Sequence, residues 1–395
     1  MFTIRTLSIG LATLTWFTLT WAAIVVHAAP ASTAVARQNP NAAVARVLRQ
    51  YEADGQISGA VTLVSDRNAT YCVALGFADL ERRTPMRANT MFGIMSMTKP
   101  ITATALMMLV DEGKMALDDP VEKYIPAFAN ARTTSDEPVR GLTIRRLLTH
   151  TSGLVGKQDC PDSLEATAEM LAERPFGFQP GEKWEYSPGM NVVGRIIEVA
   201  SGQPYDRFLQ ERIFQPLGMR QTTFHPTSAQ RRRVATLYKL EKDGKSLSPA
   251  EGWSGLGEPN CVPNPSAGLF TTVGDLERFY RMVLNHGESN GRRIVSADAV
   301  RQMTTVQTGD ITTGFTPGNG WGLGWCVVRE PQGVSGMLSP GTFGHGGAYC
   351  TEAWIDPVKN RVFLLMIQRS DLGNTDGSDI RRDFQQAAVD GLKSR

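Results

Sequence analysis

The sequence predicts an α+β fold in which one antiparallel sheet, built from both ends of the chain, is flanked by helices and carries an inserted, mostly helical subdomain. Three observations support this class. Strand-like runs rich in β-branched residues occur at about 58–80 and again after about 320. Between them, from about 96 to 319, helical patterns separated by glycine and proline dominate. Short polar turns inside each strand group indicate hairpins, which give antiparallel pairing.

The first elements are a short helix and a hairpin. An amphipathic helix is predicted from Asn41 to Tyr51. The runs SGAVTLVSD and TYCVALGFADL then predict two strands, joined by a polar turn from Asp66 to Asn68.

The next element is a buried helix, because ITATALMMLVDEG is apolar almost all round and stops at Gly113. Shorter helices are predicted at TIRRLLTH, SLEATAEMLAE, NVVGRIIEVASG, PYDRFLQERIFQPLG and TVGDLERFYRMVLNHG. Late strands are predicted within GWGLGWCVVRE, GTFGHGGAYCTEAWIDP and RVFLLMIQRS, before a final helix in DIRRDFQQAAVDGL. Asp356 to Asn360 is the predicted turn between the last two strands.

The N-terminus is typical of an export signal. Arg5 precedes an apolar stretch, and small residues follow it, so cleavage after Ala28 is predicted. The alternative is a retained membrane anchor, since the apolar stretch approaches spanning length. We therefore predict a signal peptide at 1–28, a flexible linker at 29–40 and one domain at 41–395, with its sheet from about 41–95 and 320–395. The mature protein is expected to be periplasmic or secreted, without stable membrane insertion.

Composition excludes some classes of function. A formal net charge of +2 over 395 residues gives no sign of a nucleic-acid surface, and the basic run Arg231–Arg233 is interpreted as a solvated helix face or loop. The five cysteines leave at least one thiol unpaired. A bridge between Cys160 and Cys261, both in loop sequence, and five buried free thiols are both open. The sequence predicts no oligomeric state.

Ser96 and Lys99 form the first candidate for chemistry. Pro100 has no N–H and is tolerated only in the first turn of a helix, so the buried helix should begin at or just before Ser96. Lys99 is three residues on, on the same face. A desolvated lysine can be neutral and accept the proton of a serine hydroxyl. The alternative is a capping serine beside a surface lysine, because a two-residue pattern is frequent by chance.

Other catalytic patterns give little support for a different enzyme class. The one G-x-S-x-G pattern, GESNG at 287–291, follows the predicted helix that ends at Gly287 rather than a strand, which disfavours an α/β-hydrolase. The histidines after the signal, His150, His225, His286 and His345, show no metal-ligand spacing, so no metal or other cofactor is predicted. His225 and His286 are interpreted as solvated.

Three stretches carry a family resemblance together. They are SMTK at 96–99, WEYSPGMNVVGRIIEVASGQPYDRFLQERIFQPLGM at 184–219 and FGHGGAYCTEAWIDP at 343–357, with LLTHTSGL at 147–154 as a fourth. In this order and separation they resemble the serine β-lactamase and penicillin-binding-protein superfamily, in its class C-like branch with family VIII carboxylesterases and D-aminopeptidases. The resemblance covers the chain from about residue 41 onward and implies a β-lactamase-like fold.

The resemblance implies a role for each matching residue. Ser96 would be the acylated nucleophile, Lys99 its proton partner, and Tyr186 a second base in the form of a partly deprotonated phenol. The N–H groups of Ser96 and Ala348 would form an oxyanion hole. His150, in LLTHTSGL, is interpreted instead as a structural histidine with satisfied hydrogen bonds.

The substrate-binding positions depart from the family pattern. His345 stands where the family has the lysine of K-T-G, followed by Gly346 and Gly347, which would let substrate approach the strand. Pro188 stands where an asparagine usually holds the acylamide of a β-lactam or peptide. A neutral imidazole at His345 would also attract a substrate carboxylate weakly. Both departures favour small-molecule esters over amides.

We therefore predict an exported serine hydrolase that cleaves carboxylic esters through a Ser96 acyl-enzyme. A β-lactamase or D-amino-acid peptidase of the same fold is one alternative. A non-catalytic penicillin-binding-like scaffold is the other.

Overall fold

The computed structural model describes residues 39–156, 162–252, 256–258, 260–373 and 375–392. The predicted signal peptide, most of the predicted linker and Cys160 lie outside these residues. The four described cysteines are free thiols, namely Cys72, Cys261, Cys326 and Cys350. No helix within the described ranges has both the length and the apolar character that crossing a bilayer requires.

One antiparallel sheet contains strands from both ends of the chain, in the order β10-β11-β12-β13-β14-β1-β2-β3. At its centre, Leu63 lies opposite Leu364 on one side and Cys72 on the other. This confirms the predicted fold class. The strands are β1 (Gly59–Ser65), β2 (Thr70–Asp79), β3 (Thr84–Pro85), β10 (Asn319–Trp321), β11 (Cys326–Val328), β12 (Phe343–Gly347), β13 (Thr351–Asp356) and β14 (Arg361–Met366).

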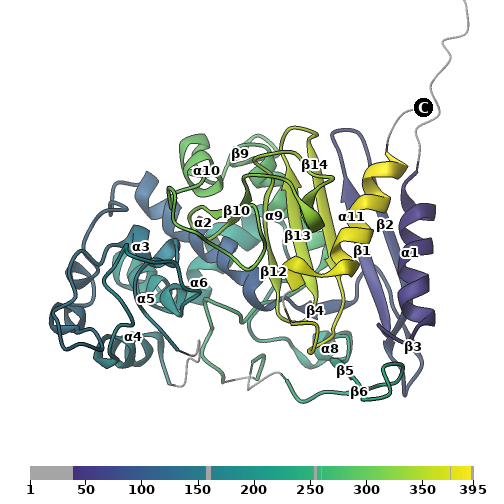
Figure 1. Ribbon diagram of the computed structural model, residues 1–395, viewed down its shortest axis with the longest axis horizontal. Coiled ribbons are helices and arrows are strands. Elements are labelled where there is room, and N and C mark those ends of the chain that lie inside the picture. The colour runs from purple at the N-terminus through teal and green to yellow at the C-terminus, as the bar shows by residue number, and fades with distance from the viewer. Residues whose placement is uncertain (1–38, 157–161, 253–255, 259, 374, 393–395) are drawn as a thin grey trace, which may run out of the picture. The chain divides into compact units, whose positions relative to one another are not determined.

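Helices cover both faces of the sheet (Figure 1). The terminal helices α1 (Asn41–Ala53) and α11 (Asp379–Gly391) pack side by side on one face, over a core that includes Leu48, Phe363 and Phe384. On the other face, α9 (Val273–Leu284) contacts β1, β13 and β14, and α2 (Thr98–Asp111) joins the same larger core. The apolar stretch after Ser96 is thus buried on most sides, as predicted.

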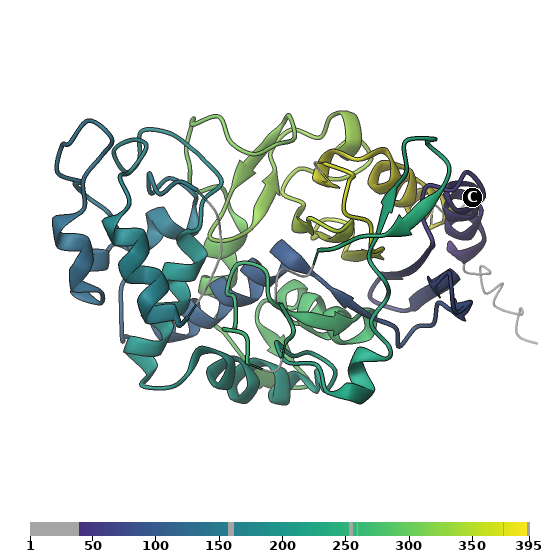
Figure 2. The same ribbon diagram turned by 90° about the horizontal axis from the view of Figure 1, so that it is seen from below.

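The helical part packs against α2 through α5 (Gly189–Ser201). In Figure 2 its teal helices lie across the green and yellow strands from the purple N-terminal helix. Its members are α3 (Ile144–Leu148), α4 (Leu164–Glu173), α6 (Tyr205–Leu209) and α7 (Gln215–Leu217), with short turns η2 (Val121–Lys123) and η3 (Pro126–Asn130). Outside this group, α10 (Ala297–Thr304) contacts α2, and α8 (Ser228–Arg231) precedes β5 (Tyr238–Leu240) in the chain.

Two predicted elements are divided. The run at 204–218 forms α6 and α7 with the π-helical turn η4 (Gln210–Phe214) between them. The run GWGLGWCVVRE forms two strands, β10 and β11, because the chain turns at Gly324, whose φ is +76°. An added Cβ at this glycine would also lie 2.7 Å from the Ala103 side chain. Small pairs were not predicted: β4 (Met91–Gly93) with β7 (Phe270–Thr272), β5 (Tyr238–Leu240) with β6 (Leu247–Pro249), and β8 (Glu288–Ser289) with β9 (Arg292–Arg293).

Candidate active site

Ser96 lies in the 3-10 turn η1 (Met95–Met97), directly before α2. Two features hold the backbone just before Ser96 in place. Met95 adopts a left-handed backbone at φ +46°, which is uncommon for a residue with a side chain. Before it, the Ile94 N–H donates to the Leu269 carbonyl at 2.9 Å. Pro100 falls in the first turn of α2, so the predicted start of the helix is correct to within two residues.

Lys99 is fully buried and points at Ser96. Its Nζ lies 3.1 Å from the Ser96 Oγ and donates to the Ser266 carbonyl at 2.9 Å. Burial holds the pKa of Lys99 well below its ordinary range, because the interior disfavours the ammonium. The structure therefore brings the serine hydroxyl within hydrogen-bond distance of an amine that favours its neutral form.

Tyr186 lies over Lys99, with the lysine Nζ 4.6 Å from the centre of its ring. Its buried hydroxyl makes no hydrogen bond of good geometry within the described residues, yet the nearby Ser96 hydroxyl acts to lower its pKa. The larger effect is burial, which raises the pKa of Tyr186 far above the usual value. A raised pKa favours the neutral phenol, whereas the resemblance implied a partly deprotonated one.

Strand β12 forms the opposite wall. β11 pairs only with Phe343 and Gly344, so the end of β12 is free of β11. A Cβ on Gly347 would lie 2.3 Å from the Ile94 carbonyl oxygen, which shows how closely this strand approaches the turn that carries Ser96. Ala348 follows Gly347 directly and is exposed.

Gly346 and Gly347 both lie where the surrounding atoms leave no room for a side chain. At Gly346 an added Cβ would meet the carboxylate oxygens of Asp376 at 2.3 Å and Glu352 at 2.7 Å. The atoms that an added Cβ would meet explain why both positions lack a side chain, and the expected approach of substrate to this strand stays a prediction.

His345 is buried and faces the Tyr186 ring, with 6.1 Å between ring centres. Its Nδ1 lies 2.7 Å from the Gly346 carbonyl oxygen. Burial lowers the pKa of His345 to about 4, although Asp376 opposes part of the shift. The imidazole is accordingly neutral at pH 7, as the sequence suggested.

His150 is part of the site rather than a remote structural residue. Its ring lies 4.5 Å from that of Tyr186, and its Nδ1 accepts a hydrogen bond from the Ser187 N–H at 3.1 Å. The buried Nε2 has no hydrogen-bond partner within the described residues, so the predicted satisfied histidine is wrong in this respect. His225 is half-buried and His286 is exposed.

Aromatic side chains extend the site toward solvent. Trp184 lies 5.3 Å from Trp321 between ring centres, and the largely exposed Phe315 lies 5.5 Å from Trp184 and 5.3 Å from Tyr186. Phe315 and the partly buried Trp184 offer apolar surface here, and the buried Trp321 packs behind them.

Sequence reasoning missed Ser266 and Asn191. The Ser266 Oγ donates to the buried Asn191 Oδ1 at 2.6 Å, and the Ser266 carbonyl accepts from Lys99. The available signal was an asparagine inside the apolar helix α5, since a buried amide needs a polar partner. Pro188 is buried as the residue before α5 and offers no side-chain amide.

Comparison with known proteins places this geometry in a family. The β-lactamase family profile matches residues 44–388. The esterase EstB of Burkholderia gladioli is 32% identical over 347 residues, covering 79% of this chain and 86% of EstB. An uncharacterized protein of Mycobacterium tuberculosis is 33% identical over 351 residues, covering 80% and 86%. The solved structure of EstCE1, a hydrolase with promiscuous acyltransferase activity, has a similar fold at a TM-score of 0.77, with 23% identity over 89% of this chain and 98% of EstCE1.

The chain belongs to the β-lactamase family. It is a hydrolase with a serine hydrolase fold.

Proposed function

We propose that this protein cleaves small carboxylic esters through a covalent acyl-enzyme on Ser96. The observation that carries the proposal is the 3.1 Å separation between the Ser96 Oγ and the Nζ of a fully buried Lys99. An amine whose pKa is depressed by burial can accept the hydroxyl proton at neutral pH. An exported form, cleaved after Ala28, is part of the proposal and is tested by N-terminal sequencing of the secreted protein.

The first step forms the acyl-enzyme. The Ser96 Oγ attacks the ester carbonyl carbon as its proton passes to the Lys99 Nζ. The resulting oxyanion is held by the N–H groups of Ser96 and Ala348, for which the close approach of β12 to η1 is the support. When the tetrahedral intermediate collapses, the bond to the alcohol oxygen breaks and the alcohol leaves as an alkoxide, which is protonated through Tyr186 at the expense of the Lys99 ammonium.

Tyr186 serves as a neutral proton relay. Its ring centre lies 4.6 Å from the Lys99 Nζ, and its pKa is too high for a standing phenolate. It donates its proton to the leaving alkoxide and regains one from the Lys99 ammonium. In deacylation, water attacks the acyl carbon and gives its proton to neutral Lys99, and Ser96 leaves with that proton.

The residues around this centre favour esters over amides. Pro188 offers no amide to hold an acylamide, and the neutral His345 offers no fixed positive charge to a carboxylate. The apolar surface of Trp184 and Phe315 instead suits an apolar acyl or alcohol group.

Parallel assays on p-nitrophenyl butyrate and nitrocefin test the substrate class. We expect butyrate ester turnover that is lost in Ser96→Ala, with nitrocefin nearly untouched. Rapid nitrocefin hydrolysis by the wild type would overturn the ester assignment. Equal ester turnover by wild type and Ser96→Ala would overturn the acyl-enzyme itself.

A further inference from the structure

A cavity of about 510 Å³ lies outside the Ser96 site. It is bordered by the corner between β2 and β4, by the segment 226–237 and by Phe270 of β7. Ser96, Lys99, Tyr186 and His345 do not line it. Its volume is in the range of small-molecule sites rather than of a flat docking surface.

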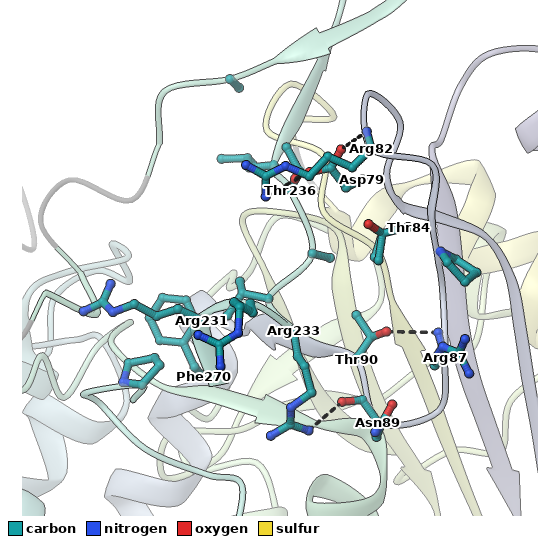
Figure 3. Close-up of a pocket in the computed structure, with 18 of the residues that line it drawn as sticks. Asp79, Arg82, Thr84, Arg87, Asn89, Thr90, Arg231, Arg233, Thr236 and Phe270 are labelled. Carbon is teal, nitrogen blue, oxygen red and sulfur yellow. Dashed lines mark hydrogen bonds and ion pairs between the residues drawn. The ribbon is translucent and has the colours of Figure 1, made fainter. Parts of the chain in front are cut away.

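The lining of this cavity is strongly basic. Five arginines contribute to it, against Asp79 and Glu258, which leaves a formal net charge of +3. Figure 3 shows Arg231 and Arg233 on one side near Phe270, with Arg87 across from them and Arg82 beside Asp79. The five arginines are Arg82, Arg87, Arg231, Arg232 and Arg233. The run at 231–233, predicted as a solvated helix face or loop, lies at the end of α8 with Arg232 exposed, and it also borders this cavity.

The protein itself uses only some of these guanidinium groups. Arg233 donates to the Asn89 carbonyl at 3.0 Å, and Arg231 is 3.5 Å from the Glu258 carboxylate. Within the described residues, the side chains of Arg87 and Arg232 have no hydrogen-bond or ion-pair partner. Two guanidinium groups with free donors therefore border the same cavity.

Besides the charged groups and the polar Thr84, Asn89, Thr90 and Thr236, the lining includes apolar side chains. The nearly buried Phe270 ring is accompanied by the buried Ala235 and Leu237 and by Pro85 at the rim. Guanidinium forks match the oxygens of phosphate, and a phosphate monoester carries close to two negative charges at pH 7. A net charge of +3 suits such a dianion better than a carboxylate.

We propose that this cavity binds a small organic phosphate monoester that carries an apolar group. Arg87 and Arg232 hold the phosphate, and Phe270 with Leu237 contacts the apolar part. The site is independent of the proposed ester hydrolysis, so neither proposal depends on the other.

Calorimetric titration with 1-naphthyl phosphate at low ionic strength tests this proposal, with 1-naphthol and inorganic phosphate as comparison ligands. We expect 1-naphthyl phosphate to bind about tenfold or more tightly than either, because only it meets both parts of the lining. Equal binding of 1-naphthol would overturn the anion site. Equal binding of inorganic phosphate would overturn the apolar part, and no binding would overturn the whole proposal.

Two double variants distinguish binding in this cavity from nonspecific attraction of the ligand to positive charge on the protein. Arg87→Ala with Arg232→Ala should weaken 1-naphthyl phosphate binding about tenfold or more. Arg46→Ala with Arg49→Ala removes the same charge from the exposed face of α1 and should leave binding within about twofold, since such charges are screened. Equal loss in both variants would contradict the site.

A final control tests whether 1-naphthyl phosphate binds in this cavity or at the Ser96 site. Protein labelled on Ser96 with a fluorophosphonate should bind 1-naphthyl phosphate as well as unlabelled protein does. Loss of binding on labelling would put the ligand in the ester site and overturn the proposal. Ester turnover should be unchanged in the Arg87/Arg232 double variant.

Discussion

The Nζ of Lys99 lies 3.1 Å from the Oγ of Ser96 and is completely shielded from solvent. Two features of the chain produce this relationship. The left-handed Met95 turns the chain so that Ser96 precedes the helix, and the apolar helix α2 keeps Lys99 dry one turn later. A serine with a lysine three residues on is common, whereas a lysine forced toward its neutral form beside that serine is the chemically useful arrangement.

Replacing Lys99 with methionine tests the role of the amine. Lys99→Met should reduce kcat/KM for p-nitrophenyl butyrate by about 10³-fold, because the serine loses its general base. The fold should survive, since a buried amine is exchanged for an apolar chain of similar length. The control is Lys114→Met, at an exposed lysine paired with Glu112, which should retain full activity. An active Lys99→Met enzyme would contradict the account.

A methyl group at Gly347 should separate β12 from the serine turn. The added Cβ would lie 2.3 Å from both the Ile94 carbonyl oxygen and the Thr351 Oγ1, so the strand must move. We expect Gly347→Ala to lower the free energy of unfolding by about 1 to 3 kcal/mol and to remove most ester turnover. Gly274→Ala, where an added Cβ meets nothing within 4 Å, is the matched control for chemical unfolding and kinetics. Normal turnover in Gly347→Ala would refute the close approach.

Acid should destabilise the fold through His345. Its pKa falls from an ordinary 6.5 to about 4 in the folded protein, so the unfolded chain binds the proton first as the pH drops. The stabilising effect of neutral His345 is therefore present above pH 6.5 and is lost as the pH falls toward 4. Urea unfolding should show wild type losing about 2 to 3 kcal/mol more than His345→Gln between pH 7 and pH 4. Parallel losses in the two proteins would contradict this assignment.

Alkali should destabilise the fold through Glu352. Burial and the neighbouring Asp376 carboxylate raise the pKa of Glu352 well above its ordinary value near 4.5. The folded protein keeps this proton when the unfolded chain has lost it, so stability falls as the pH rises from about 4.5 into the alkaline range. At pH 9, urea unfolding should give Glu352→Gln a higher free energy of unfolding than wild type. The difference should exceed the roughly 0.5 kcal/mol that a surface substitution produces. A gain of the same size at pH 4 would rule out the titration.

The sequence predicted the features of the fold that depend on short stretches of the chain. The runs at 59–65 and 361–366 are mostly apolar and are bounded by turn residues, so both were found, and their antiparallel pairing followed from the hairpins beside them. Pro100 placed the start of the buried helix. Of the proposed residues, the structure brings Ser96, Lys99 and Tyr186 together and places Ala348 directly after the strand that packs on the Ser96 turn.

Long-range packing controls what the sequence did not predict. His150 and Tyr186 are far apart in the chain, and only the folded helical region stacks them. Ser266 acts through its backbone carbonyl, which any residue possesses, so no side-chain pattern could identify it. The protonation of Tyr186 likewise depends on burial, which local sequence does not report.

The most direct test of the central claim is intact-protein mass spectrometry of enzyme mixed with p-nitrophenyl butyrate and quenched in acid during turnover. The account predicts a mass increase of one butyryl group, located on the peptide that contains Ser96 and missing from Ser96→Ala. A butyryl group on another residue, or ester turnover by Ser96→Ala at the wild-type rate, would contradict the account.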